Sequence, residues 1–145
     1  MPASIPSTAS QLKVLGHPVR LRLLAALAAG ELCVCQLTAL LQLANSTASE
    51  HLAELRAAGL IVERKDGRWV LYRLVEPSSR PAWLDEVLDD LARDAQVLED
   101  RRILRSLRAI PLADVCRADR DLVRLGIVKP ARRAPRATQA RSHSR

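Results

Sequence analysis

The sequence predicts a mainly α-helical fold with a small β-hairpin, an α+β arrangement in one domain with tails. Three observations support this prediction. Apolar residues recur at helical spacing in successive short segments before Gly59. Two strand-like runs, LIVERK and RWVLYRL, then flank Asp66-Gly67, a dipeptide that is typical of hairpin turns. A long amphipathic helix is predicted from about Pro81 to Ala109.

The short helices are separated by residues that start or stop helices. A first helix over 10–15 is broken at Gly16-His17-Pro18, and Pro18 suits the first turn of the next helix, which Gly30 ends. The segment CVCQLTALLQLA follows and places its leucines on one face. A third helix is expected from about residue 45 to residue 58, with Gly59 as its terminator.

We expect four parts along the chain: a flexible N-terminus (1–9), a domain that includes a C-terminal dimerisation helix (10–109), an extension with room for one short helix (110–128), and a basic disordered tail (129–145). The net charge is +7, from 23 Lys and Arg against 16 Asp and Glu. The excess lies mostly in the tail, which contains no acidic residue. Such a tail either strengthens nucleic-acid binding without sequence preference or is only a solvated arm.

The long helix predicted over 81–109 carries more apolar surface than a domain of this size covers alone. Its apolar positions include Leu84, Leu91 and Leu98. We therefore expect it to pair two copies of the chain as a homodimer. The alternative is a helix that folds back on its own domain.

The composition also indicates the cellular compartment. No run of about 18 apolar residues occurs, and the N-terminus lacks the layout of a secretion signal, so we expect no membrane partner. A cytoplasmic location follows, in which thiols stay reduced. The odd count of three cysteines also argues against a disulfide framework.

Two short helices joined by a tight link and followed by a hairpin describe a winged helix-turn-helix. In this fold the second helix of the pair enters the major groove and the hairpin contacts the DNA backbone. The candidate contacts are polar residues of the helix and cations near the hairpin tip: Asn45, Ser46, Thr47, Ser49, Glu50, Arg64, Lys65 and Arg68. In this order they favour double-stranded DNA as the partner.

Each of these residues also has a plainer interpretation. Ser46 and Thr47 could only cap the helix, since Thr47-x-x-Glu50 matches a capping box. Glu50 could accept a hydrogen bond from cytosine or only close that box. The hairpin cations could form an ordinary solvated face. His51 is expected to be a structural hydrogen-bonding residue at the edge of the buried side.

Two stretches make the chain resemble the ArsR/SmtB family of metal-responsive repressors, over roughly residues 10–76: HPVRLRLLAALAAGELCVCQL and NSTASEHLAELRAAGLIVERKDGRWVLYRL. ELCVCQL in particular resembles the ELCVCDL signature of arsenite-sensing members. The resemblance implies a homodimer that represses by binding an operator and leaves it when a thiophilic ion binds. It further implies Cys33 and Cys35 as ligands, trivalent arsenic or antimony as the inducer, and no organic cofactor.

The spacing of Cys33 and Cys35 restricts how they could share one ion. Side chains two positions apart in a helix point about 200° apart, so a shared ion requires an extended or unwound segment. We expect the helix to begin near Cys33 in the free protein, and a bound ion to hold this turn open and so favour the conformation that releases DNA. The structural alternative is two small apolar residues at a helix start.

The third ligand is the open question of this site. Thiolates select soft ions, and trivalent arsenic or antimony takes three sulfurs in a pyramid. In the arsenite-sensing signature a third cysteine commonly follows three residues after the second, and Thr38 stands there in this chain. Cys116 could supply the sulfur from its own subunit or from the partner, or it could be an idle buried thiol.

Other classes of site and function are less well supported. The zinc site on the dimer helix of the family uses His, and residues 81–109 contain none. No GxSxG, HExxH or phosphate-cradling glycine loop occurs, so we do not expect an enzyme. Two rival functions stay open: a repressor that releases DNA when a cysteine is oxidised, and a DNA-independent interaction or ion-buffering module.

Overall fold

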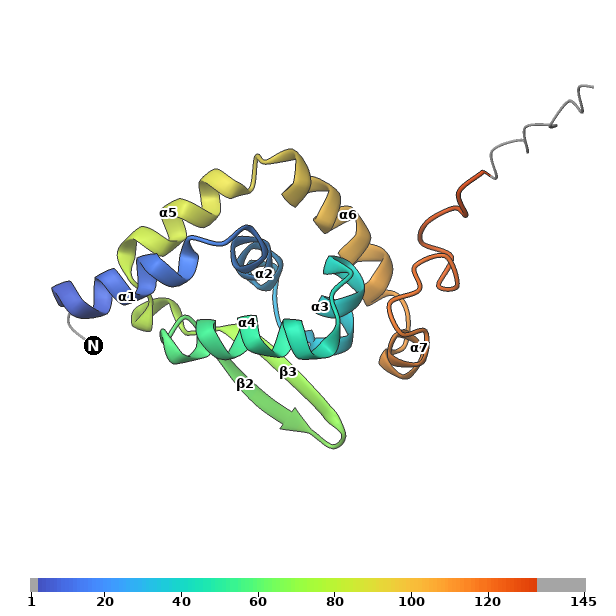
Figure 1. Ribbon diagram of the computed structural model, residues 1–145, viewed down its shortest axis with the longest axis horizontal. Coiled ribbons are helices and arrows are strands. Elements are labelled where there is room, and N and C mark those ends of the chain that lie inside the picture. Colours follow the sequence, from blue (N-terminus) through green and yellow to red (C-terminus); the bar gives the residue numbers. More distant parts are fainter. Residues whose placement is uncertain (1–2, 133–145) are drawn as a thin grey trace, which may run out of the picture.

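The computed structural model describes residues 3–132 and has the predicted order of short helices, hairpin and C-terminal helices (Figure 1). The elements are α1 (Ile5–Leu15), α2 (Pro18–Ala28), β1 (Leu32–Cys33), α3 (Val34–Leu41), α4 (Asn45–Ala57), β2 (Ile61–Asp66), β3 (Trp69–Leu74), the 3-10 turn η1 (Pro77–Ser79), α5 (Ala82–Leu91), α6 (Ala95–Arg108) and α7 (Leu112–Arg117). Within this described part, no helix is long and apolar enough to cross a membrane.

Helix α2 lies at the centre of the molecule and packs against α4, α5, α6 and β3 (Figure 1). Its Leu23 and Leu24 are fully buried, together with Leu37 of α3 and Leu52 and Leu55 of α4. Burying one such side chain stabilises a fold by about 1.5–3 kcal/mol. The leucine core therefore fixes the helix pair α3–α4 on one side of α2 and the C-terminal helices on the other.

Helix α1 begins at Ile5, earlier than the predicted start at Ser10, because Ser4 and Ser7 cap it reciprocally. The Ser7 backbone N–H donates to Ser4 Oγ, and the Ser4 N–H donates to Ser7 Oγ, both at 3.2 Å. The expected flexible segment 1–9 is thus helical from Ile5 onward. The helix leaves Ile5 and Leu12 largely exposed, at 87% and 53%.

The predicted hairpin is confirmed, with its turn one position further on than expected. Asp66 pairs with Trp69 in the antiparallel register, so Gly67 and Arg68 form the two-residue loop. Gly67 has φ 58° and Asp66 does not have a positive φ. Glycine at the first central position is the pattern of a type II′ turn, which needs a positive φ only there.

A third strand extends the hairpin into a sheet with the order β1-β3-β2. Strand β1 pairs antiparallel with β3, with Cys33 opposite Leu71. Leu71 also pairs with Arg64 of β2 on its other side. The segment that carries Cys33 is therefore part of the same sheet as the hairpin β2–β3 (residues 61–74), which we call the wing.

The prediction of one long helix from Pro81 to Ala109 is wrong. The chain breaks between α5 and α6, because Asp94 caps the second helix: its Oδ1 accepts from the N–H groups of Gln96 and Val97 at 2.8 and 3.2 Å. An aspartate at the N-cap satisfies donors that have no partner within the helix. The break lets α5 and α6 arch over α2 instead of projecting from the domain (Figure 1).

The two helices consequently bury part of their apolar stripe within their own chain. Leu84, Leu88 and Leu104 lie in the core. Leu91 and Ile103 are only half-buried and Leu98 is 53% exposed, so pairing with a second copy stays a prediction. A partly buried ion pair holds α6 to α2: the guanidinium of Arg22 donates twice to the buried Asp100, at 2.8 Å each.

Helix α7 confirms the short helix expected in the C-terminal extension, and it packs against α3. Its Val115 is fully buried. Beyond it, Gln42 Nε2 donates to the carbonyl of Arg120 at 2.9 Å. The division of the chain at residues 109 and 128 stays a prediction, and most of the basic tail lies outside the described residues.

Candidate sulfur site and DNA-facing surface

Cys33 stands at the junction between β1 and α3, outside the helix. Its backbone is extended, with φ −74° and ψ 150°, and its N–H donates to Gln36 Oε1 at 2.9 Å. Pairing with Leu71 fixes it from the other side. The helix therefore begins directly after Cys33, as expected. That a bound ion holds this turn open stays a prediction.

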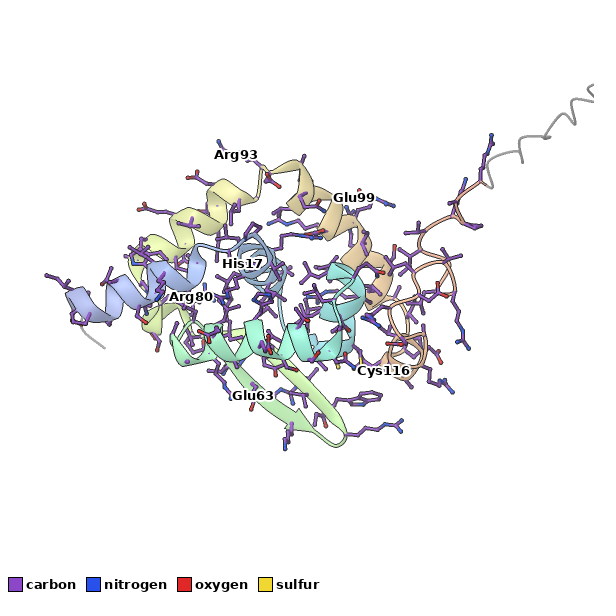
Figure 2. The ribbon with its side chains drawn as sticks, viewed as in Figure 1. His17, Glu63, Arg80, Arg93, Glu99 and Cys116 are labelled. Carbon is purple, nitrogen blue, oxygen red and sulfur yellow. A yellow bond between two sulfur atoms is a disulfide. The ribbon has the colours of Figure 1, made fainter. Side chains whose placement is uncertain are left out.

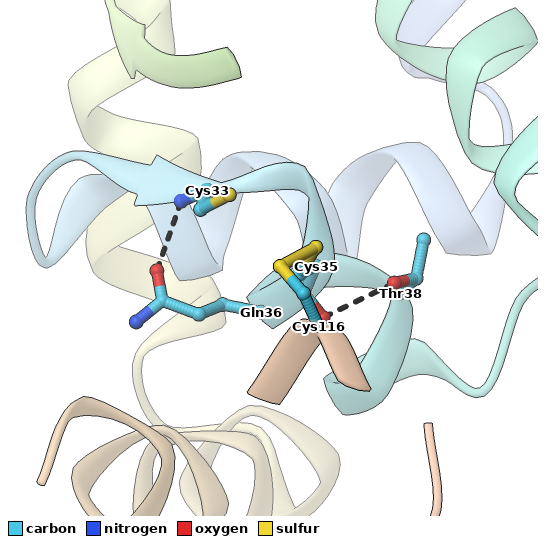
Figure 3. The surroundings of a disulfide bond; sticks show 5 residues. All are labelled: Cys33, Cys35, Gln36, Thr38 and Cys116. Carbon is cyan, nitrogen blue, oxygen red and sulfur yellow. Dashed lines mark hydrogen bonds between the residues drawn. A yellow bond between two sulfur atoms is a disulfide. The ribbon is translucent and has the colours of Figure 1, made fainter. Parts of the chain in front are cut away.

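This backbone geometry brings the three cysteines together (Figure 3). Cys35 lies in the first turn of α3, and Cys116 comes from α7, which packs against that helix. The three Sγ atoms all lie within 4.8 Å of one another. Cys33 is buried, whereas Cys35 and Cys116 are half-buried.

Cys35 and Cys116 form a disulfide, with their Cα atoms 5.2 Å apart and a sequence separation of 81 positions. The expectation that all three thiols are reduced is therefore corrected, and Cys33 is the free cysteine. The thiolate is the form that binds ions and attacks electrophiles. The cluster can thus offer three sulfur ligands only after this bond has been reduced.

Thr38 does not replace the missing cysteine as a ligand. Its Oγ1 donates to the carbonyl of Cys35 at 3.1 Å (Figure 3), so the hydroxyl is used within the first turns of α3. The third sulfur that lies near Cys33 and Cys35 belongs to Cys116 of α7. Sequence patterns could identify Cys116 only as a candidate, because nothing local to it specifies its contact with α3.

On helix α4, every side chain that was predicted to contact DNA is exposed. Asn45, Ser46, Thr47, Ser49 and Glu50 are all exposed, while Ala48 and Leu52 face the core. The N-cap is Ala44, whose side chain makes no capping bond. The capping interpretation of Ser46 and Thr47 is therefore wrong, since both lie inside the first turn, where their hydroxyls are left for other partners.

His51 forms a hydrogen bond, as predicted, with Arg20, whose Nε donates to Nδ1 at 3.2 Å. Its ring lies 4.6 Å from that of His17, which caps α2 by accepting from the Val19 N–H. Burial, followed by the nearby positive charges, lowers the pKa of His51. The Arg20–His51 hydrogen bond therefore links the start of α2 to the middle of α4.

The wing carries its cations on an exposed surface, but one of them is already paired. Arg64, Lys65 and Arg68 are all exposed. Arg64 donates to both carboxylate oxygens of Glu31, at 2.8 and 2.6 Å. These hydrogen bonds lower the pKa of Glu31 and raise that of Arg64. Arg68 lies over the ring of Trp69, 4.7 Å from its centre.

Glu31 is a functional candidate that the sequence did not reveal. It lies two residues before Cys33 and reaches the wing only because β1 joins the sheet beside β3. Its partner Arg64 lies on β2, with β3 between β2 and β1, and β1 is too short to be recognised as a strand from the sequence. The sulfur cluster and the wing are thus connected by one sheet and by this ion pair.

A family model described as "Bacterial regulatory protein, arsR family" matches residues 17–62. The arsenic resistance transcriptional regulator ArsR1 of Pseudomonas putida is 51% identical over 59 residues, which are 41% of this chain and 44% of that protein. ArsR2 of the same organism is 39% identical over 90 residues, 60% of this chain and 76% of its own. The arsenical resistance operon repressor of Escherichia coli is 41% identical over 85 residues, 58% and 71% of the two chains.

Solved structures show the same fold. Reduced HlyU from Vibrio cholerae has a TM-score of 0.53 at 32% identity and covers 61% of this chain and 87% of its own. The transcriptional repressor BigR from Xylella fastidiosa has a TM-score of 0.52 at 32% identity and covers 60% and 84%. With its winged helix-turn-helix fold and these similarities, the chain belongs to the arsR family of bacterial regulatory proteins.

Proposed function

We propose that this protein is a homodimeric transcriptional repressor that leaves its operator when trivalent arsenic or antimony binds the thiolates of Cys33, Cys35 and Cys116. The observation that carries the proposal is the meeting of three sulfurs, all within 4.8 Å of one another, from two distant parts of the chain. Soft thiolate ligands select thiophilic ions. The printed names of the similar regulators, which refer to arsenic resistance, agree with this ion class.

DNA recognition is assigned to α4 and the wing. The exposed hydroxyls of Ser46, Thr47 and Ser49, with Asn45, suit close approach to base edges. Lys65 and Arg68 near the hairpin tip suit phosphates. The protein then acts in the cytoplasm, where its operator would be.

The sheet offers a route by which the ion could weaken DNA binding. Cys33 belongs to β1, which pairs with the wing strand β3, while Cys116 belongs to α7, which packs on α3. An ion that binds all three sulfurs would link α7, the start of α3 and strand β1 at the edge of the sheet. If this arrangement differs from the one that fits the operator, linkage requires that DNA be released.

Dimerisation is assigned to the apolar residues that the single chain leaves uncovered. Ile5 and Leu12 of α1 and Leu98 of α6 are large, apolar and exposed. A hollow lined by Ala3, Ile5, Thr8 and Leu12 accompanies them on α1. A second copy of the chain would remove these side chains from water. Sedimentation equilibrium should report a dimer.

The decisive experiment is a gel shift on the protein's own promoter after full reduction, with arsenite added in steps. Cys33→Ser, Cys35→Ser and Cys116→Ser should each bind DNA like the parent and keep it at arsenite concentrations that release the parent. Thr38→Cys in the Cys116→Ser background should restore release, since it returns a third sulfur beside Cys35. Release from all three serine variants at the parent's concentration would refute the sulfur site.

A second function is favoured by one specific observation, the disulfide between Cys35 and Cys116. We infer that oxidation is an alternative signal to the ion, because both use the same two sulfurs. One of the similar structures is HlyU in its reduced form. Gel shifts with oxidised and reduced protein, in the absence of arsenite, separate the two signals. A protein that never shifts promoter DNA would instead support the interaction or ion-buffering module.

A further inference from the structure

A hollow of about 340 Å³ lies between the wing and α7, next to the disulfide. It is lined by Arg68 and Trp69 from the wing and by Ala113, Cys116 and Arg117 from α7. The other two cysteines do not line it, and Cys33 is 1% exposed. Cys116 is therefore the disulfide cysteine that lines this hollow.

The lining combines two guanidinium groups with a flat aromatic side chain. Arg68 stacks on the Trp69 ring, and Arg117 is held by an ion pair with Asp114 on its own helix. Asp114 partly neutralises Arg117, but Arg68 makes no ion pair within the described residues, so the surface turned toward Cys116 keeps a net positive charge. Guanidinium groups bind carboxylates through paired hydrogen bonds. The chemistry therefore suits an anionic guest with a sulfur of its own.

We propose that this hollow receives a low-molecular-weight thiol that carries carboxylates, and that its thiolate attacks Sγ of Cys116. A new S–S bond then joins the small thiol to Cys116, the bond from Cys116 to Cys35 breaks, and Cys35 leaves as a thiolate. A second thiol molecule displaces Cys116 from the mixed disulfide. In total, two small thiols become one small disulfide, and their two hydrogen atoms pass to Cys35 and Cys116.

This exchange goes beyond the proposed function and depends only on the disulfide and the hollow. It would decide when the sulfur cluster becomes able to bind an ion. Because it involves neither DNA nor arsenic, it can be measured without them. Its failure would leave the repressor proposal untouched, and the reverse also holds.

The first test compares thiols of opposite charge on the full-length disulfide form. Reduction by glutathione, which is anionic, and by cysteamine, which is cationic, is followed by alkylation and mass spectrometry. Both rates are divided by the rates of the same thiols with bis(2-hydroxyethyl) disulfide. We expect the corrected ratio to favour glutathione by about two- to fivefold, as for one solvent-exposed ion pair.

Variants identify the source of that preference. Arg68→Gln and Arg117→Gln should each lower the ratio toward one, whereas Arg105→Gln, an exposed cation in the last turn of α6, should leave it unchanged. Circular dichroism checks that each variant is folded. A ratio near one in the parent, or an equal loss in all three variants, would overturn the proposal.

A second test locates the attack. Both variants also carry Cys33→Ser, because Cys33 lies close enough to displace a small thiol from either neighbour. Cys33→Ser/Cys35→Ser then has no second thiol in the cluster, so oxidised glutathione should leave a stable mixed disulfide on Cys116. Cys33→Ser/Cys116→Ser should be modified at Cys35 much more slowly, because Cys35 does not line the hollow. Equal or faster modification of Cys35 would show that the small thiol enters elsewhere.

Discussion

Replacing Glu31 by Gln should strengthen DNA binding and make it more sensitive to salt. In the parent, Arg64 donates to both Glu31 oxygens and its remaining terminal nitrogen lies 3.9 Å from Asp66. The pair presents no net charge to a nearby phosphate. Glu31→Gln removes the carboxylate and leaves the cation, so each subunit gains one positive charge at the wing.

The size of the effect follows from the count of phosphates. Each neutralised phosphate adds about 0.9 to the slope of log K against log salt, so a dimer should gain about 1.8. Raising salt from 50 to 200 mM should then weaken the variant about twelvefold more than the parent. Fluorescence anisotropy with labelled operator, repeated across this range, measures the slope directly.

Glu99→Gln is the matched control, because Glu99 makes the same two-bond pair with Arg102, at 2.9 and 2.6 Å. It lies on α6, on the side of the molecule away from the hairpin (Figure 2). The double variant Glu31→Gln/Arg64→Gln should return to the parent's slope. An unchanged slope in Glu31→Gln, or the same increase in Glu99→Gln, would refute the assignment of Arg64 to the DNA backbone.

Three further variants test other parts of the structure. Ser46→Ala with Ser49→Ala should reduce the preference for operator over random DNA while the protein stays folded; an unaltered footprint would place the reading face elsewhere. Leu12→Glu should shift sedimentation from dimer to monomer, and a persistent dimer would exclude α1 from the interface. Asp100→Ala should lower the free energy of unfolding, measured in urea, by about 3 kcal/mol. This is the low end for a broken buried ion pair, because the Arg22 side chain keeps 27% exposure. A loss below about 1 kcal/mol would contradict this reasoning.

Local signals predicted most of the DNA-reading half of the fold. Helical spacing, terminating glycines and the Asp66-Gly67 pair were sufficient, because each acts within a few residues. The break before α6 was missed although Asp94 is a common N-cap residue, since the apolar periodicity continues on both sides of it. That periodicity describes a buried face equally well whether a partner or the chain's own core covers it.

In the candidate site, too, local patterns predicted some features, whereas others depend on contacts between distant residues. The extended backbone at Cys33 depends on its pairing with Leu71, which lies 38 positions further along the chain. The position of Cys116 depends on the packing of α7 against α3. Neither contact produces a periodic pattern in the sequence. The family resemblance supplied the ligand role of Cys33 and Cys35, whereas only the structure shows how close the third sulfur lies.

The strand order β1-β3-β2 also bears on self-association. Strand β2 is at the outer edge of the sheet, where unpaired backbone groups could bind the same edge of another molecule. Its exposed run Glu63-Arg64-Lys65-Asp66 places charges along this edge, which opposes such pairing. Alanine substitutions in the wing would remove that protection together with the DNA contacts. Glutamine substitutions, which keep a polar edge, are therefore the safer way to test the wing without causing aggregation.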